Sequence, residues 1–330
     1  MKKKQSLLKW IAIFALIAVM YAVPAFVKNE YVLRVCVYIC IYSIMASSLN
    51  LISGVCGQVS MGHAAFCGIG AYTSALISLY FGLPWPVCLL LACVMAGVTG
   101  VLIGIPALRL QGGYLVICTV GFNELVRLIL LNWSSLTRGP MGLTNIARPV
   151  LFGIRIKSGY QYLFVALTLF LIVYVLLNNI IRSKFGRNLR AIKEDETAAE
   201  TMGIRVHREK VIAFALASAL AGTAGSMLAH YMVYISPALF IGDYSTTYLS
   251  MVVLGGMGNM AGSVVAAMVL TILPEMLRGL DSYRMLIYGL LLILLMLGKT
   301  RDWSTTSLAR TWTRGKNALL ARLRARGKGE

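Results

Sequence analysis

The chain has 330 residues, of which 58% are hydrophobic and 13% are charged, and its formal net charge is +19. Soluble globular proteins carry about 45–50% apolar and about 25% charged residues, so this composition excludes a soluble enzyme, a disordered tail and a coiled coil. A transmembrane helix needs about 20 apolar residues, which leaves room for about ten spans in one integral membrane domain. The basic excess fits the enrichment of Lys and Arg on the cytoplasmic side of membrane proteins better than it fits nucleic-acid binding.

Ten apolar runs follow one another along the chain, and we interpret them as an all-α integral membrane protein. They are Trp10–Val27, Val32–Ile52, Val59–Phe81, Pro86–Ala107, Tyr114–Leu131, Tyr160–Ile181, Val211–Val233, Tyr244–Gly255, Ala261–Leu277 and Tyr283–Leu297. The first run is longer than the apolar core of a signal peptide, about 7–15 residues, so we expect an uncleaved span. The eighth run is too short for a full span and is expected to be a short or broken element buried by its neighbours.

The distribution of Lys and Arg predicts the orientation of these spans. With ten crossings, 22 basic residues fall on the side of the N-terminus and 8 on the other side. Because basic residues collect in cytoplasmic loops, both termini and the polar loop 182–210 are expected to be cytoplasmic. The predicted organisation is a transmembrane domain over residues 1–298, containing that loop, and a basic cytoplasmic tail over 299–330. The tail can lie on anionic membrane lipid or remain solvated.

Two glycine-rich segments interrupt the apolar runs at corresponding places in the two halves of the sequence. One is Gly54–His63 and the other is Gly255–Gly262, and each places a glycine beside an amide side chain. Such segments point to inverted repeats around a central pathway, while close helix packing through small residues is an equal alternative. The candidate pathway residues here are Gly57, Gln58, Gly62, His63, Gly258 and Asn259. Neither segment matches the phosphate loop GxxxxGK[ST], so this chain is not expected to bind or hydrolyse ATP.

Charged residues also interrupt the fifth apolar run. Glu124 and Arg127 are three residues apart, which places them on one face of a helix, and Asn123 precedes them. Intramembrane charges face the protein interior and mark pathways, and the structural alternative is a mutual ion pair that locks helix packing. We interpret His63 as a packing or hydrogen-bonding residue rather than a proton relay. No nucleophile–base or paired-carboxylate arrangement supports an enzyme.

The polar loop contains a short helix signal. Acidic residues 194–196 precede a helical stretch, Thr197 to Met202, and Gly203 follows it. Acidic side chains favour a helix N-terminus, and glycine suits the position after a helix C-terminus. The pattern predicts a surface helix with small side chains that a partner groove can approach, with an ordinary solvated loop as the alternative.

This stretch, Glu196-Thr-Ala-Ala-Glu-Thr-Met-Gly203, resembles the coupling loop of ABC import permeases, whose pattern is Glu-Ala-Ala, three residues, then Gly. Thr197 departs from the pattern, and its downstream Leu-Pro is absent. The segments Asn50–Tyr72, Thr119–Arg127, Thr137–Leu143 and Gly186–Glu194 resemble signatures of the branched-chain amino acid permease family. The resemblance covers about residues 31 to 298 and is nearest to the LivM-type subunits.

The resemblance implies a type II-like ABC importer architecture in the bacterial inner membrane, with about ten transmembrane helices in inverted-repeat halves. It implies a homologous LivH-type permease, two ATPase subunits of LivG/LivF type and a periplasmic amino-acid-binding protein as partners. ATP and Mg would be held by the ATPase subunits, and this chain would bind no cofactor. The residues implied to couple to the ATPase are Glu194, Glu196, Thr197, Ala198, Ala199, Glu200 and Gly203. Cargo other than Leu, Ile and Val (urea, short amides, other amino acids) and a passive small-solute channel remain as alternatives.

Overall fold

The computed structural model describes residues 30–110, 112–151, 154–156 and 158–276, together with residues 289, 290 and 293. The chain divides after Ile272 into two compact units, and the arrangement given below is that of the first unit. The predicted span Trp10–Val27, nearly all of Tyr283–Leu297 and the basic tail lie outside the described residues.

Six described helices are long and apolar enough to cross a membrane. They are α2 with its continuation η1 (Glu30–Val55), α3 (His63–Phe81), α4 (Trp85–Ala107), α5 (Gly113–Asn132), α7 (Gly159–Arg182) and α10 (Val206–Met232). Two further apolar runs form shorter helices, α11 (Gly242–Gly255) and α12 (Met260–Met276). The chain is therefore a multi-pass helical membrane protein, and the total of about ten helices in inverted-repeat halves stays a prediction.

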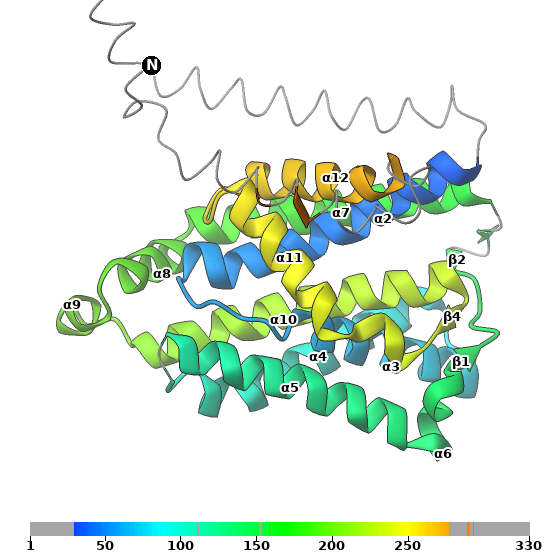
Figure 1. Ribbon diagram of the computed structural model, residues 1–330, viewed down its shortest axis with the longest axis horizontal. Coiled ribbons are helices and arrows are strands. Elements are labelled where there is room, and N and C mark those ends of the chain that lie inside the picture. Colours follow the sequence, from blue (N-terminus) through cyan, green and yellow to red (C-terminus); the bar gives the residue numbers. More distant parts are fainter. Residues whose placement is uncertain are drawn as a thin grey trace, which may run out of the picture. The chain divides into compact units, whose positions relative to one another are not determined.

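The remaining elements gather at the two ends of these helices. The short helices α8 (Lys184–Glu194) and α9 (Glu196–Thr201) follow α7 at one end, at the left of Figure 1. The opposite end holds α6 (Ser134–Thr137), η2 (Gly139–Met141) and two antiparallel strand pairs, and η3 (Pro237–Phe240) follows the last strand. The strand pairs are β1 (Leu143–Thr144) with β4 (Tyr234–Ile235), and β2 (Val150–Leu151) with β3 (Ile154–Arg155).

Small residues let α3, α4 and α10 pack with their backbones in close contact. A Cβ added to Gly70 of α3 would lie 2.3 Å from the carbonyl oxygen of Gly222 in α10, and one added to Gly225 would lie 1.9 Å from that of Cys67. Gly222 also approaches Ala96 of α4. Transmembrane helices associate through such close contacts because lipid supplies no hydrophobic driving force between them. This packing forms the core of the first unit.

The helices differ in how much of their surface the chain itself covers. In the most apolar 18-residue stretches of α2–η1 and α10, 78% and 67% of the sequence is buried. In the corresponding stretches of α4 and α5, only 28% and 33% is buried. The outer helices therefore present broad faces to lipid or to another subunit.

Candidate functional site

Helices α8 and α9 form a short polar module between the spans α7 and α10. The sequence predicted one helix here, and the structure adds α8 before it. Asp195 caps α9, since its Oδ1 accepts a hydrogen bond from the backbone N–H of Ala198 at 3.0 Å. Gly203 adopts a left-handed conformation with φ of 81°, and the N–H of Ile204 donates to the carbonyl of Ala199. The predicted end signals of this helix are thus confirmed, with the helix itself shifted by one residue.

The surface of α9 separates the predicted coupling residues into two groups. Ala199 is buried against the rest of the chain and Glu196 is half-buried. The other members are exposed and available to a partner: Glu194, Thr197, Ala198, Glu200 and Gly203. Met202, which the sequence analysis did not select, is 82% exposed beside them.

Glu196 binds residues of this chain. Its carboxylate forms an ion pair with Lys210 of α10, whose side chain is only 2% exposed. The same oxygen, Oε1, accepts a hydrogen bond from Nε2 of Gln58 at 3.1 Å. Gln58, predicted as a pathway residue, therefore connects the first glycine-interrupted segment to α9.

A second contact joins the same two parts of the chain. Lys193, at the end of α8, donates from Nζ to the carbonyl oxygen of Gly54 at 2.9 Å. Gln58, Lys193 and Glu196 help to line an open cleft of about 590 Å³, which is formed by the segment Cys56–Val59, the start of α5 and residues 192–197. Burial raises the pKa of the Cys56 thiol to about 12, so this lining cysteine stays protonated near neutral pH.

The two glycine-interrupted segments meet in the structure. Asn50, in the π-helical end of α2, accepts a hydrogen bond at its Oδ1 from the backbone N–H of Gly258 at 2.8 Å. A Cβ added to Gly54 would lie 2.3 Å from that same backbone nitrogen. Only glycine permits this approach, which gives Gly54 a packing role. Gly258 and Asn259 are exposed beside this junction, and Gly57 is exposed on the cleft side.

The starts of α3 and α11 converge on the middle of α5. The backbone N–H of Ala64 donates to Oγ of Ser245 at 2.9 Å, and Ser245 donates to Oδ1 of Asn123 at 3.4 Å. The Asn123 amide in turn donates to the carbonyl oxygen of Phe240 at 3.3 Å. This buried network joins the starts of α3 and α11 to α5 at one point.

Gly62 and His63 lie next to this network. A Cβ on Gly62 would lie 3.1 Å from the Thr119 carbonyl oxygen, so Gly62 permits close packing against α5. His63 is fully buried, and its Nε2 lies 3.0 Å from Oγ of Ser48. The hydrogen-bonding interpretation of His63 is therefore supported.

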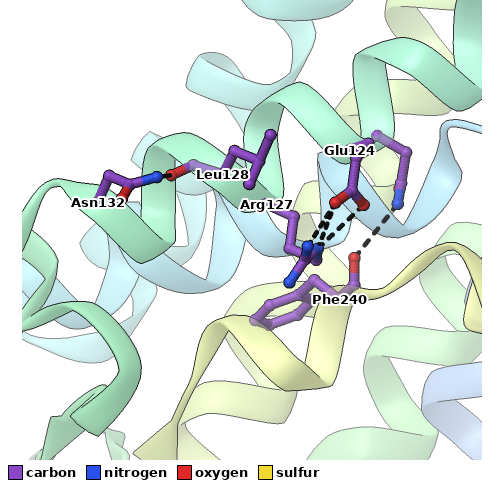
Figure 2. A network of polar contacts seen from close by, with 6 residues as sticks. Glu124, Arg127, Leu128, Asn132 and Phe240 are labelled. Carbon is purple, nitrogen blue, oxygen red and sulfur yellow. Dashed lines mark hydrogen bonds and ion pairs between the residues drawn. The ribbon is translucent and has the colours of Figure 1, made fainter.

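Glu124 and Arg127 form the ion pair that their spacing predicted, and Figure 2 shows the two side chains turned toward each other on α5. The Arg127 Nε donates to both carboxylate oxygens, at 3.0 and 2.9 Å. The expectation that the pair faces the interior of the chain is not met, since the Arg127 and Glu124 side chains are 26% and 48% exposed. The pair thus lies on the outer surface of a membrane-spanning helix.

The sequence analysis did not select Lys193, Lys210, Asn50 or Ser245. Each forms its contact with residues more than ten positions away. Asn50 and Lys193 lie within segments that resemble the permease signatures, and Lys210 is a charged residue in the first turns of the apolar helix α10, but none of these signals names a contact partner.

Comparisons with known proteins agree with the fold. The family described as "Branched-chain amino acid transport system / permease component" matches residues 31–296. The chain is 37% identical over 280 residues to the "High-affinity branched-chain amino acid transport system permease protein LivM" of Escherichia coli K12, and 36% identical to its Salmonella typhimurium counterpart. Each match covers 78% of this chain and 66% of the relative, so the matched part falls just short of two thirds of those proteins.

A second kind of relative matches more weakly. The LivH permease protein of Escherichia coli K12 is 26% identical over 291 residues, which covers 78% of this chain and 88% of that protein. No solved structure matches the chain.

Proposed function

This chain belongs to the family of branched-chain amino acid transport system permease components, and from that premise we propose that it is one membrane subunit of an ATP-driven importer of Leu, Ile and Val. The family match over residues 31–296 supports the transport role, and the names of the LivM relatives support the cargo. In this proposal a periplasmic protein binds the amino acid, and separate ATPase subunits hydrolyse ATP with Mg.

The single observation that carries the coupling to ATP is the exposed module α8–α9. It projects between two spans, its helix is capped at both ends, and small side chains occupy its exposed surface. Thr197, Ala198 and Thr201 allow a groove to approach closely, and exposed Met202 supplies an apolar contact. We place α9 in a groove of the ATPase, so that closure of the ATPase dimer moves it.

The second permease is proposed to cover the face of α5 that carries Glu124 and Arg127. Charged side chains are costly against hydrocarbon, even when paired, so this face needs protein or water rather than lipid. Exposed Gly121, one turn before Glu124, allows a neighbouring helix to approach closely. A LivH-type subunit is the proposed occupant, and substrate passes between the two.

The proposed location is the bacterial inner membrane, with both termini and α8–α9 on the cytoplasmic side. The excess of Lys and Arg in the tail and around α8–α9 supports this orientation.

The proposal is tested by reconstituting this chain with its second permease, ATPase subunits and binding protein in liposomes. We expect uptake of labelled leucine that requires ATP and the binding protein, and that unlabelled Leu, Ile and Val suppress while urea does not. If only urea or short amides suppress the uptake, the cargo is one of these compounds and the assignment to Leu, Ile and Val is wrong. Uptake by this chain without ATP or partners would instead identify a passive channel and overturn the importer proposal.

A further inference from the structure

The side chain of Glu196 is directed into the chain, away from the surface proposed to meet the ATPase. It pairs with buried Lys210 and accepts a hydrogen bond from Gln58 at 3.1 Å. Because Lys210 anchors Glu196 to the first turns of α10, the carboxylate is held in one position when Gln58 binds it. Glu196 therefore connects α9 to the segment Gly54–Gly62, which leads from the end of η1 to α3.

Lys193 makes a second connection to the same segment about one helical turn earlier in the chain. Its Nζ reaches the carbonyl oxygen of Gly54 at 2.9 Å. Its aliphatic stem lies over Gly57, where an added Cβ would be 2.9 Å from the lysine Cγ. The absence of a side chain at Gly57 is therefore what lets the lysine lie flat across the segment.

From these two contacts the segment leads into the membrane helices in two directions. At its start, Gly54 and Asn50 touch Gly258 in the turn between α11 and α12. At its end, the backbone N–H of Met61 donates to Oγ1 of Thr119 in α5 at 3.0 Å. Thr119 lies one turn before Asn123, next to the exposed ion pair of α5. A displacement of the segment would therefore act on both α5 and the α11–α12 turn.

We propose that Gln58–Glu196 and Lys193–Gly54 form a double tether that transmits movement of the α8–α9 module to the segment Gly54–Gly62, and through it to α5 and the α11–α12 turn. Two points of attachment, one on α8 and one on α9, constrain the segment to follow the module more closely than one hydrogen bond can. Gln58 and Lys193 are thus positioning residues for transport and do not contact substrate. This inference rests on the proposed function, in which the ATPase moves α9.

The test replaces the two donors and leaves the buried ion pair intact. Gln58→Leu and Lys193→Met keep the approximate volume of each side chain and leave Glu196 paired with Lys210. The variants are assembled with the partner subunits in liposomes, and recovery of the ATPase, ATP hydrolysis and leucine uptake are measured together. A purely structural defect would lower all three, so the informative quantity is leucine transported per ATP hydrolysed.

We expect the double variant to retain its ATPase subunits and hydrolyse ATP, while leucine transported per ATP falls at least about fivefold, the range of typical coupling between sites. Each single variant should lower the ratio by about twofold or more, as expected for loss of one hydrogen bond. Lys193 is exposed, so Lys193→Met tests the proposal even if the double variant does not fold. Lys193→Arg keeps a cationic donor and should retain most of the ratio.

The matched control is Lys184→Met, the same change at an exposed position on the same helix. It should leave the ratio unchanged. If the wild-type assembly transports leucine with ATP and the double variant has the same ratio, the tether is wrong while the proposed function stands. If the wild-type assembly itself shows no ATP-dependent uptake, the proposed function fails first.

Discussion

Two ion pairs in the described part of the chain have opposite surroundings. Lys210–Glu196 lies at the loop end of α10, just before the apolar run of that helix, yet the lysine side chain is only 2% exposed. Glu124–Arg127 lies in the middle of a membrane-spanning helix, yet its members are 26% and 48% exposed. The first pair holds parts of this chain together. The second is paired within α5 and lies on an exposed surface that lipid solvates poorly, which is the basis of the proposed contact with a second permease.

The largest effect is expected from breaking the first pair. Glu196→Ala leaves Lys210 buried without an anion, which should lower the free energy of unfolding by about 3 kcal/mol, at the lower end for buried pairs because Glu196 is 30% exposed. Chemical unfolding of the purified chain in mild detergent measures it. Adding Lys210→Met removes the stranded charge and should restore most of the loss. A single variant as stable as wild type would show that the pair contributes nothing.

Breaking the second pair should lower the rate of transport rather than the stability of the isolated chain. Glu124→Lys places two cations on the exposed face of α5, so the isolated chain should unfold as wild type does. In the assembled importer, leucine uptake should fall about tenfold or more, because like charges are repelled within a dry interface.

A neutral version of the second pair sharpens this test. Glu124→Gln with Arg127→Gln removes both charges, keeps the size of the first side chain and shortens the second, and should retain more uptake than Glu124→Lys if mutual neutralisation is what the interface requires. Equal uptake by all these variants would place the face against lipid or bulk water and remove the proposed interface.

A smaller effect is expected at the end of the helix that holds Glu196. Gly203 has φ of 81° and open space where a Cβ would be, so Gly203→Ala introduces backbone strain without a clash. We expect a loss of about 1 kcal/mol, seen as faster hydrogen exchange of the α9 amides. Gly113→Ala, also in open space but without positive φ, is the matched control and should leave exchange in α9 unchanged.

The smallest effect on stability is expected at Glu200, which is exposed on α9. Glu200→Lys should change the unfolding free energy by no more than about 0.5 kcal/mol. Recovery of the ATPase with the assembled importer should nevertheless fall, because this residue belongs to the proposed contact surface. Undiminished recovery would move that contact away from Glu200.

Much of the architecture was predictable because a bilayer imposes a length and an apolar composition on each span. Six of the ten apolar runs appear as full-length helices, and the short run at Tyr244–Gly255 appears as α11 with 14 residues. The ends of α9 were predictable because capping is decided within a few residues, as at Asp195 and Gly203. The pairing of Glu124 with Arg127 followed from helical spacing alone.

The residues alone were enough to predict the membrane class, the positions of the long described helices, the polar module between α7 and α10, and the resemblance to a permease family. The directions in which the polar side chains face depend on how the helices pack. Spacing along a helix cannot show that Glu124 lies outward, or that Glu196 turns inward to Lys210 and Gln58. Those contacts join residues 14 and 138 positions apart. They exist because helix packing brings distant segments together, and the cost of burying a charge then selects the partners that satisfy it.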